Sequence, residues 1–267
     1  MIRVAVTGAA GRMGSRVIAL LQEEESLKLA GAVEKEDHAA VGRDAGEKAG
    51  LPSLGVPIRG DLSEVISDCE VIIDFTAPAA SLRNIELVSA AEKAIVVGTT
   101  GFPKADIDRI RTLSARCPCV LSPNMSVGVN ILFKVLGEIA PILGTEYDVE
   151  IYEAHHRFKK DAPSGTALRM AQIIARALGR DLEDVGVFGR KGVIGERTHE
   201  EIGIHTLRAG DIVGEHTVVF GGMGERIELV HRAQSRDNFA RGALRAAKFA
   251  AHAGNGVWDM LDVLGLK

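Results

Sequence analysis

The stretch that decides the fold is Ile2-Arg3-Val4-Ala5-Val6-Thr7-Gly8-Ala9-Ala10-Gly11-Arg12-Met13-Gly14. Its apolar part, residues 2–7, predicts a buried strand, and a helix is expected over residues 11–25. In such a turn the first glycine allows a tight bend, the second lets a pyrophosphate approach the backbone, and the third lets the helix pack on the strand. The helix start adds free N–H groups and a positive dipole end. The stretch therefore predicts a dinucleotide site, with the spacing G-x-x-G-x-x-G in place of G-x-G-x-x-G.

Strands and helices continue to alternate outward from this turn. Further buried strands are expected over residues 27–33, 71–75, 94–98 and 119–122. Helices are expected over residues 61–66, 81–93 and 104–115, and residues 35–60 are expected to be irregular. Apolar strands that alternate with helices are typical of a parallel sheet covered on both faces. The pattern predicts a Rossmann-like, doubly wound α/β domain over residues 1–125.

The pattern changes after residue 124 and becomes rich in longer strands. Helices are expected over residues 126–143, 164–178 and 237–253, and strands over residues 147–155, 202–207, 215–220 and 226–230. Turn signals between the last strands favour a mixed or antiparallel sheet. We expect residues 126–235 to form an α+β domain for substrate binding and oligomerisation, and residues 236–267 to pack back on the first domain.

Composition narrows the class of protein. A formal net charge of −4 gives no general attraction to nucleic acid or to an anionic membrane, so neither is an expected partner. Three cysteines (Cys69, Cys117 and Cys119) are too few for a disulfide framework and are expected to be reduced thiols. No uninterrupted apolar run approaches the ~20 residues of a membrane span. We expect a soluble, cytoplasmic protein.

The acidic residue Glu34 ends the second strand, twenty positions beyond Gly14. A carboxylate at this place usually accepts hydrogen bonds from the ribose of the dinucleotide, although a plain surface glutamate is the alternative. Lys35 follows directly and could pair with a 2′-phosphate, helped by Arg12; a solvated surface charge is the alternative for Lys35. These residues predict a site that accepts NADH and NADPH.

The ends of two more expected strands carry residues that could line the same dinucleotide site. Phe75-Thr76 follows the third strand, and Gly98-Thr99-Thr100-Gly101 follows the next. Ligands of open parallel sheets lie at the carboxyl ends of strands. The glycines of the second loop would let the backbone approach a nicotinamide ring.

The densest polar segment is Glu153-Ala154-His155-His156-Arg157-Phe158-Lys159-Lys160-Asp161-Ala162-Pro163-Ser164-Gly165-Thr166. It lies between an expected strand and an expected helix, whose first N–H groups form an anion site. Basic residues just before the helix can converge on the same anion. A substrate with carboxylate groups suits this arrangement, and a charged surface loop before a capped helix is the alternative.

This segment resembles the signature of the dihydrodipicolinate reductase family, also called 4-hydroxy-tetrahydrodipicolinate reductases, of lysine and diaminopimelate biosynthesis. Other stretches match the family in the same order: residues 8–14, 74–76, 98–101, 122–130, 208–216 and 231–233. The resemblance implies an NAD(P)H-dependent oxidoreductase that reduces 4-hydroxy-tetrahydrodipicolinate, through the dehydrated cyclic imine, to tetrahydrodipicolinate. It also implies a homotetramer formed through the sheet of the second domain.

The resemblance implies roles for matching residues. His155 would be the acid/base residue, and Lys159 would help with the proton or with substrate charge. The substrate-binding positions would be Thr100, His156, Lys159, Ser164, Gly165 and Thr166. The cofactor-binding positions would be Gly8, Ala10, Gly11, Arg12, Met13, Gly14, Glu34, Lys35, Phe75, Thr76, Gly98, Thr99, Thr100, Ser122, Asn124 and Met125. Ala77 stands where some members carry a basic residue, which leaves any 2′-phosphate to Lys35 and Arg12.

Two other functions stay open from the sequence alone. One is a related oxidoreductase that acts on another imine or on an aldehyde, and the other is a non-catalytic NAD(P)-sensing protein. A metal site is not expected, because His199, His205 and His216 lie in strand-like surroundings without a completing set of ligands.

Overall fold

A computed structural model describes residues 1–267, and its residue contacts divide the chain into two units. Unit 1 consists of Met1–Val127 and Arg236–Lys267, and unit 2 consists of Gly128–Ser235. Each unit has a sheet and a hydrophobic core of its own.

Unit 1 is built on a seven-stranded sheet in which all neighbouring strands are parallel. Its strands in spatial order are β12 (Gly256–Trp258), β6 (Pro118–Leu121), β5 (Ala94–Val97), β4 (Val71–Asp74), β1 (Ile2–Thr7), β2 (Leu27–Val33) and β3 (Ile58–Arg59). The strand order reverses beside β1, which pairs with β2 on one edge and with β4 on the other. Ligands of such sheets bind where the order reverses, at the carboxyl ends of the strands.

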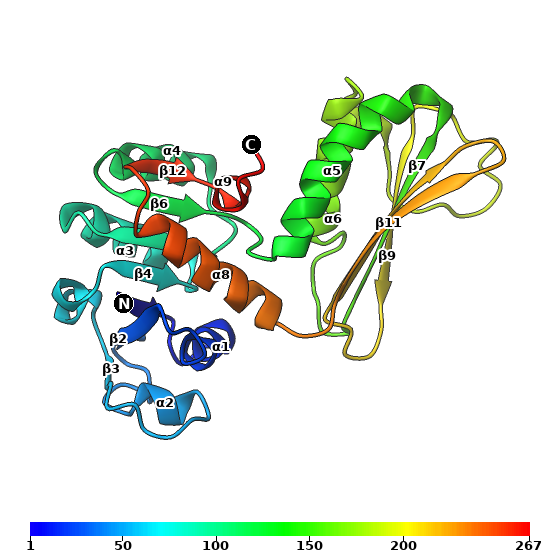
Figure 1. The fold of residues 1–267 in the computed structure, drawn as a ribbon. Coiled ribbons are helices and arrows are strands. Elements are labelled where there is room, and N and C mark those ends of the chain that lie inside the picture. Colours follow the sequence, from blue (N-terminus) through cyan, green and yellow to red (C-terminus); the bar gives the residue numbers. More distant parts are fainter. The chain divides into compact units, whose positions relative to one another are not determined.

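Helices cover both faces of this sheet (Figure 1). They are α1 (Arg12–Leu21), α2 (Ala45–Lys48), α3 (Pro78–Ala90), α4 (Lys104–Leu113), α8 (Asp237–Ala250) and α9 (Met260–Leu264). Successive side chains of a strand point to opposite faces. Val4 and Val6 therefore pack with α1 and α8, whereas Ala5 and Ile72 belong to the core under α3 and α4. The predicted fold class is confirmed for this unit.

Several element boundaries differ from the prediction. Residues 35–60 are not wholly irregular, because α2 and β3 lie within them, and β12 with α9 follows the last long helix. A strand of two or three residues carries no measurable periodicity, so the sequence could not reveal it. The helix α3 begins at Pro78, three residues earlier than expected, because proline suits the first turn of a helix. The short helix expected over residues 61–66 is a pair of 3-10 turns, Leu62–Glu64 and Ile66–Asp68.

Unit 2 is built on a mixed five-stranded sheet with helices on one face (Figure 1). Its strands in spatial order are β11 (Arg226–Ala233), β10 (Gly214–Gly221), β7 (Asp148–His155), β9 (Ile202–Arg208) and β8 (Gly186–Val187). Its helices are α5 (Val127–Leu143), α6 (Gly165–Ala177) and α7 (Leu182–Val185). The pairs β11–β10 and β10–β7 are antiparallel, and β7–β9 and β9–β8 are parallel. The prediction of a mixed sheet is confirmed.

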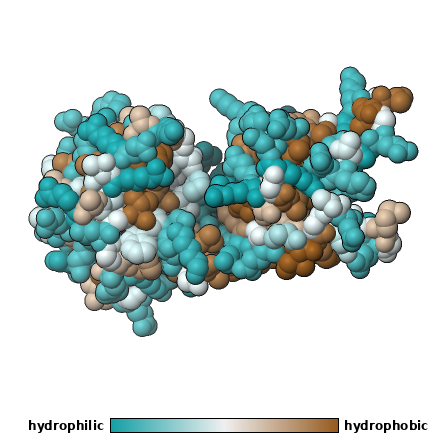
Figure 2. All heavy atoms as spheres, turned by 90° about the horizontal axis from the view of Figure 1, so that it is seen from above, coloured by the Kyte–Doolittle hydropathy of each residue, from teal (hydrophilic) through white to brown (hydrophobic).

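The other face of this sheet is not covered by helices of unit 2. Tyr152, Leu207 and Val230 point to it and expose 46%, 52% and 42% of their surface. Thr217 pairs with both Tyr152 and Val230, so these two lie in one row across β7, β10 and β11. Figure 2 shows apolar surface on unit 2 between polar side chains. We call the sheet face to which Tyr152, Leu207 and Val230 point the open face.

The helix α5 is long and strongly apolar. With the turn that follows it, Val127–Glu146 has a mean hydropathy of 1.6 and is long enough and apolar enough to cross a membrane. The same length and composition occur in core helices of soluble proteins. Asn130, Lys134 and Glu138 interrupt its apolar run, and Leu136 lies fully buried in the core of unit 2.

Candidate active site

The glycine-rich turn joins β1 to α1 where the strand order reverses. Gly8 has a φ of +71°, and a Cβ there would lie 2.6 Å from the carbonyl oxygen of Phe75. A Cβ on Gly14 would lie 2.1 Å from the carbonyl oxygen of Gly8. Gly11 is the N-cap of α1 and offers no side-chain acceptor to the N–H groups of the first turn. The turn therefore fits a phosphate held against bare backbone at a helix start.

Glu34 lies directly beside this turn. Its Oε2 accepts the backbone N–H of Ala10 at 3.0 Å, and its Oε1 accepts the N–H of Lys35 at 3.0 Å. The carboxylate is thus fixed within reach of a ligand on the turn. The Lys35 side chain is 77% exposed and pairs with Asp37 at 2.8 Å, which lowers the pKa of Asp37. Arg12 is exposed and Met13 packs partly against the core of unit 1.

A buried carboxylate to which the sequence alone assigns no role organises the neighbouring loops. Asp74 ends β4 and is fully buried. Six donors surround it at 2.6–3.1 Å: the hydroxyl of Thr7, the N–H and hydroxyl of Thr76, the hydroxyl of Ser81, the amide of Asn84 and the hydroxyl of Thr99. The signal in the sequence is a single acid at the end of an otherwise apolar strand. Asp74 ties together the ends of β1, β4 and β5.

The other predicted cofactor positions of unit 1 lie at the same edge of the sheet. The ring of Phe75 lies over Gly98, where a Cβ would be 2.1 Å from the ring. Thr100 is exposed at the end of β5. After β6, the Ser122 hydroxyl donates to the carbonyl of Asn124 at 2.9 Å. The Met125 side chain is buried in the core of unit 1.

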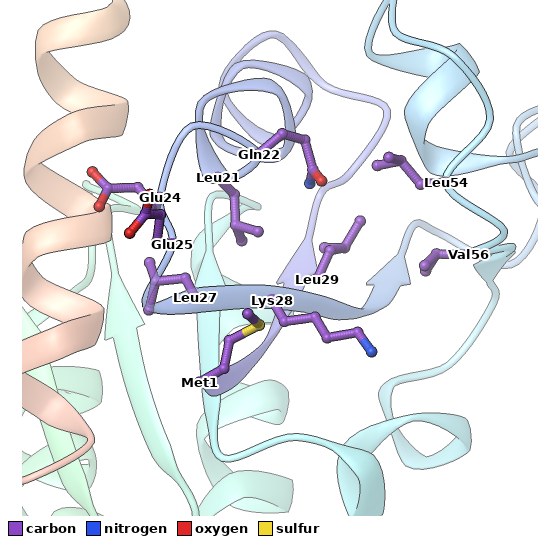
Figure 3. A pocket seen from close by; sticks show the side chains of 10 residues that line it. All are labelled: Met1, Leu21, Gln22, Glu24, Glu25, Leu27, Lys28, Leu29, Leu54 and Val56. Atoms are coloured by element: carbon purple, nitrogen blue, oxygen red, sulfur yellow. The ribbon is translucent and has the colours of Figure 1, made fainter.

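A hollow of about 430 Å³ in unit 1 lies at the opposite edge of the sheet (Figure 3). Its lining includes Met1, before β1, and Leu27 and Leu29, in the first half of β2. Dinucleotides bind at the carboxyl ends of parallel strands. This hollow at the amino ends is therefore separate from the candidate cofactor site.

In unit 2, His155 ends β7 next to a buried carboxylate. Its Nδ1 lies 2.5 Å from Oε2 of Glu153, which is fully buried. Arg208, which lies opposite His155 on the neighbouring strand β9, donates to both oxygens of the same carboxylate. Burial alone would raise the pKa of Glu153, but hydrogen bonds from His155 and Arg208 lower it to about 2. The carboxylate is therefore ionised at neutral pH.

The start of α6 lies beside this pair. The N-cap of α6 is Ser164, whose hydroxyl accepts the N–H of Ala167 at 3.2 Å and whose own N–H donates to Glu153 at 3.0 Å. Gly165, at the first helical position, adds no side chain that would cover the helix start. Sequence reasoning placed Ser164, Gly165 and Thr166 here as an anion site, and the geometry is that of a capped helix start.

The basic residues of the segment lie on the turn between β7 and α6. Lys159 pairs with Asp161 at 2.9 Å and lowers its pKa. His156 Nδ1 is buried and has no hydrogen-bond partner. Both residues are partly buried.

The buried histidine His216 contacts both Ser164, at the start of α6, and His155. Its Nε2 lies 3.1 Å from the hydroxyl of Ser164, and its ring meets the ring of His155 edge-on at 5.2 Å. Burial, followed by the nearby His155, lowers the pKa of His216 to about 3, so it is neutral in the folded protein. His205 contacts Glu150 on the open face and His199 is 80% exposed, so these three histidines do not gather. The structure contains no group of three or more possible metal ligands.

Comparison with known proteins gives the family. A profile described as "Dihydrodipicolinate reductase, N-terminus" matches residues 2–125, and one described as "Dihydrodipicolinate reductase, C-terminus" matches residues 128–264. The chain belongs to the dihydrodipicolinate reductase family. Members of this family are nicotinamide-dependent oxidoreductases, so the enzyme class predicted from the sequence is confirmed.

Individual members of the dihydrodipicolinate reductase family match the chain from end to end. The 4-hydroxy-tetrahydrodipicolinate reductase of Syntrophus aciditrophicus is 57% identical over 267 residues, and that of Citrifermentans bemidjiense is 55% identical, each over all of both chains. A solved structure of a dipicolinate-bound dihydrodipicolinate reductase from Paenisporosarcina sp. TG-14 is 27% identical over 98% of both chains, with a TM-score of 0.76. The family, first inferred from the motifs, is thereby confirmed over the whole chain.

Proposed function

We infer that this chain reduces 4-hydroxy-tetrahydrodipicolinate, through the dehydrated cyclic imine, to tetrahydrodipicolinate in lysine and diaminopimelate biosynthesis. The observation that carries the inference is that His155 and the helix start at Ser164 contact one carboxylate, that of Glu153, in a chain whose two halves both match the family. A ring with two carboxylates needs cationic or N–H partners, and its reduction needs a proton donor. Unit 2 offers both kinds of group within one segment.

The residues at the carboxyl edge of the unit 1 sheet would hold the nicotinamide dinucleotide. The bare backbone of Gly8, Gly11 and Gly14 fits the pyrophosphate, and Glu34 is held where ribose hydroxyls are usually bound. When bound, the reduced nicotinamide supplies a hydride to the conjugated C4 of the substrate ring. The loops tied by Asp74 would carry Phe75, Thr76, Gly98 and Thr99 toward the nicotinamide end.

We propose that both NADH and NADPH are accepted. Glu34 favours the unmodified ribose, and Lys35 is exposed and available to a 2′-phosphate if it leaves Asp37. Arg12 is the second cation near the turn. Ala77 adds no charge, so the proposed phosphate contacts depend on Lys35 and Arg12.

In unit 2, His155 would deliver the proton and the neighbouring groups would bind the substrate. A histidine suits general acid catalysis near neutral pH, because its ordinary pKa of about 6.5 lies close to the working pH. Lys159 and His156 would balance the substrate carboxylates, together with the N–H groups and hydroxyls of Ser164, Gly165 and Thr166. Thr100 would add a contact from the nucleotide-binding loops.

We propose that the enzyme is a cytoplasmic homotetramer, without nucleic acid or membrane partners. The open face supports the assembly, because Tyr152, Leu207 and Val230 are exposed there and a second copy would cover them. Three buried cysteines without disulfides fit a reducing compartment. Light scattering should give about four times the chain mass of 28.4 kDa. A monomeric mass at micromolar concentration would contradict the proposed assembly.

The test of the proposed reaction is a steady-state assay of NADH and NADPH oxidation with the purified protein. The cyclic substrate is compared with open-chain imines and with aldehydes. We expect turnover with the cyclic dicarboxylate and a kcat/KM at least about 100-fold lower for substrates that lack one carboxylate, because a paired charge is lost. Equal turnover of an aldehyde would favour a different oxidoreductase, and dinucleotide binding without any turnover would favour a sensor.

A further inference from the structure

One carboxylate, that of Glu153, contacts both the proposed proton donor and the proposed anion site. Its Oε2 lies 2.5 Å from His155 Nδ1, and its Oε1 accepts the backbone N–H of Ser164 at 3.0 Å. Glu153 and His155 are two positions apart on β7 and so share one face of the sheet. Glu153 is the first residue of the segment that resembles the family signature, but the sequence alone assigns it no role.

The position of the carboxylate is fixed by further contacts on both oxygens. The Thr206 hydroxyl donates to Oε1 at 3.2 Å, and Arg208 donates from Nη1 to Oε2 at 2.8 Å and from Nη2 to Oε1 at 2.9 Å. Arg208 also donates to the backbone carbonyl of Asp161, on the turn before α6. A buried charge needs such a partner, and the two-pronged guanidinium contact leaves the carboxylate one orientation.

This arrangement determines which nitrogen of His155 is free. An ionised carboxylate only accepts hydrogen bonds, so Nδ1 must carry the proton that lies between it and Glu153. No protein group bonds the other nitrogen, Nε2. Nε2 lies near Gly214 on β10, and a Cβ on Gly214 would be 3.1 Å from it. The neighbouring His216 ring meets His155 edge-on and is neutral, so it adds no competing charge.

We propose that Glu153 is a positioning residue that keeps the proton of His155 on Nδ1, aims Nε2 at the substrate, and holds the start of α6 at a fixed distance from it. The proposal deepens the proposed function and rests on it. In the proton step, the Nε2–H bond of the imidazolium breaks, its electron pair stays on nitrogen, and a C–H bond forms at C3 of the ring. The Nδ1–H stays hydrogen-bonded to Glu153 throughout.

The first test reads the tautomer and needs no turnover. Two-bond ¹H–¹⁵N spectra of ¹⁵N-histidine-labelled protein, recorded at alkaline pH, report which ring nitrogen carries the proton. We expect the Nδ1–H form in the wild type, although free histidine prefers Nε2–H. In Glu153→Gln we expect the Nε2–H form or a mixture. An Nε2–H form in the wild type overturns the proposal without any use of the variant.

The second test separates kcat from KM, with a control from the same strand. Glu150 is the matched residue: it contacts a histidine, His205, at 2.7 Å and two arginines, Arg190 and Arg197, but its side chain lies on the open face. We expect Glu153→Gln to lower kcat about 100-fold and to raise KM by less than about tenfold. Glu150→Gln, in samples whose assembly is checked by light scattering, should keep kcat within about twofold.

The outcomes distinguish the proposal from the function on which it rests. If the wild type does not reduce the cyclic substrate, the proposed function fails, while the tautomer spectra still test the contact between Glu153 and His155. If the wild type is active and Glu153→Gln keeps its kcat, or if Glu150→Gln loses as much activity, the positioning role is wrong. Binding of dipicolinate, measured by calorimetry, should weaken less than about tenfold in Glu153→Gln; a complete loss would show that Glu153 maintains the fold of the site only.

Discussion

The buried histidine His216 makes the stability of unit 2 depend on pH in a way that one substitution should remove. Its pKa is lowered to about 3 in the folded protein, mainly by burial, and an unfolded chain has a histidine pKa of about 6.5. Between these values the unfolded state binds a proton that the folded state does not. The contribution of the neutral His216 to the free energy of unfolding is therefore fully present above pH 6.5 and is lost progressively as the pH falls toward 3.

The magnitude follows from the difference between the two pKa values. At pH 5 the unfolded histidine is almost fully protonated and the folded one is neutral, which costs about 2 kcal/mol of unfolding free energy relative to pH 7. In His216→Gln that proton is absent from both states. We expect the wild type to lose about 2 kcal/mol more than this variant between pH 7 and pH 5.

The assay is urea unfolding at several pH values, followed by the tyrosine signal. Tyr147 and Tyr152 are the two tyrosines of the chain and both lie in unit 2, whereas Trp258 reports on unit 1. His252, exposed on unit 1, is the control, and His252→Gln should keep the wild-type dependence. Equal losses in the wild type and in His216→Gln would refute the claim that the folded protein holds this histidine neutral.

Three further substitutions, with one control, probe the two candidate sites. His155→Ala should lower kcat by roughly 10²–10⁴-fold with little change in NADH affinity, and unchanged turnover would exclude His155 from the mechanism. Asp74→Asn puts an amide donor among hydroxyl and N–H donors, so it should cost about 2–4 kcal/mol of stability and weaken NADH binding in a fluorescence titration. Ser114→Ala, at a buried hydroxyl before β6, should lower stability but leave that affinity unchanged. Lys35→Ala should lower kcat/KM for NADPH about tenfold more than for NADH, and an equal loss would contradict the phosphate role.

The fold of unit 1 could be predicted because its signals are local. The strand before Gly8, the helix after it and the repeated apolar strands each lie within a short stretch of sequence. The strand β12 could not be predicted in this way, because three residues after a long helix join the edge of the sheet beside β6, far away in the sequence. It is held there by its pairing with β6 and by the contact of Trp258 with Phe249 of α8, and not by any pattern of its own.

The candidate site was predicted in its parts but not in its connections. The motif placed His155 near Ser164, yet the carboxylate that contacts both went unused, although a spacing of two on a strand already puts Glu153 and His155 on one face. The contacts of Arg208 and His216 with the site could not be predicted from the sequence, because both residues are brought next to Glu153 by the register of β9 and β10. Asp74 shows the same limit: its six donors come from five different residues spread over residues 7–99.

The most direct test of the proposed reaction follows the hydride itself. NADH carrying two deuterium atoms at C4 of the nicotinamide is oxidised by the enzyme in the presence of the cyclic substrate, and the product is trapped and weighed by mass spectrometry. We expect one deuterium per product molecule, located at C4 of the ring, with the proton at C3 taken from solvent. NADH oxidation that leaves the ring free of deuterium, or the absence of oxidation with either cofactor, would contradict the proposed reaction.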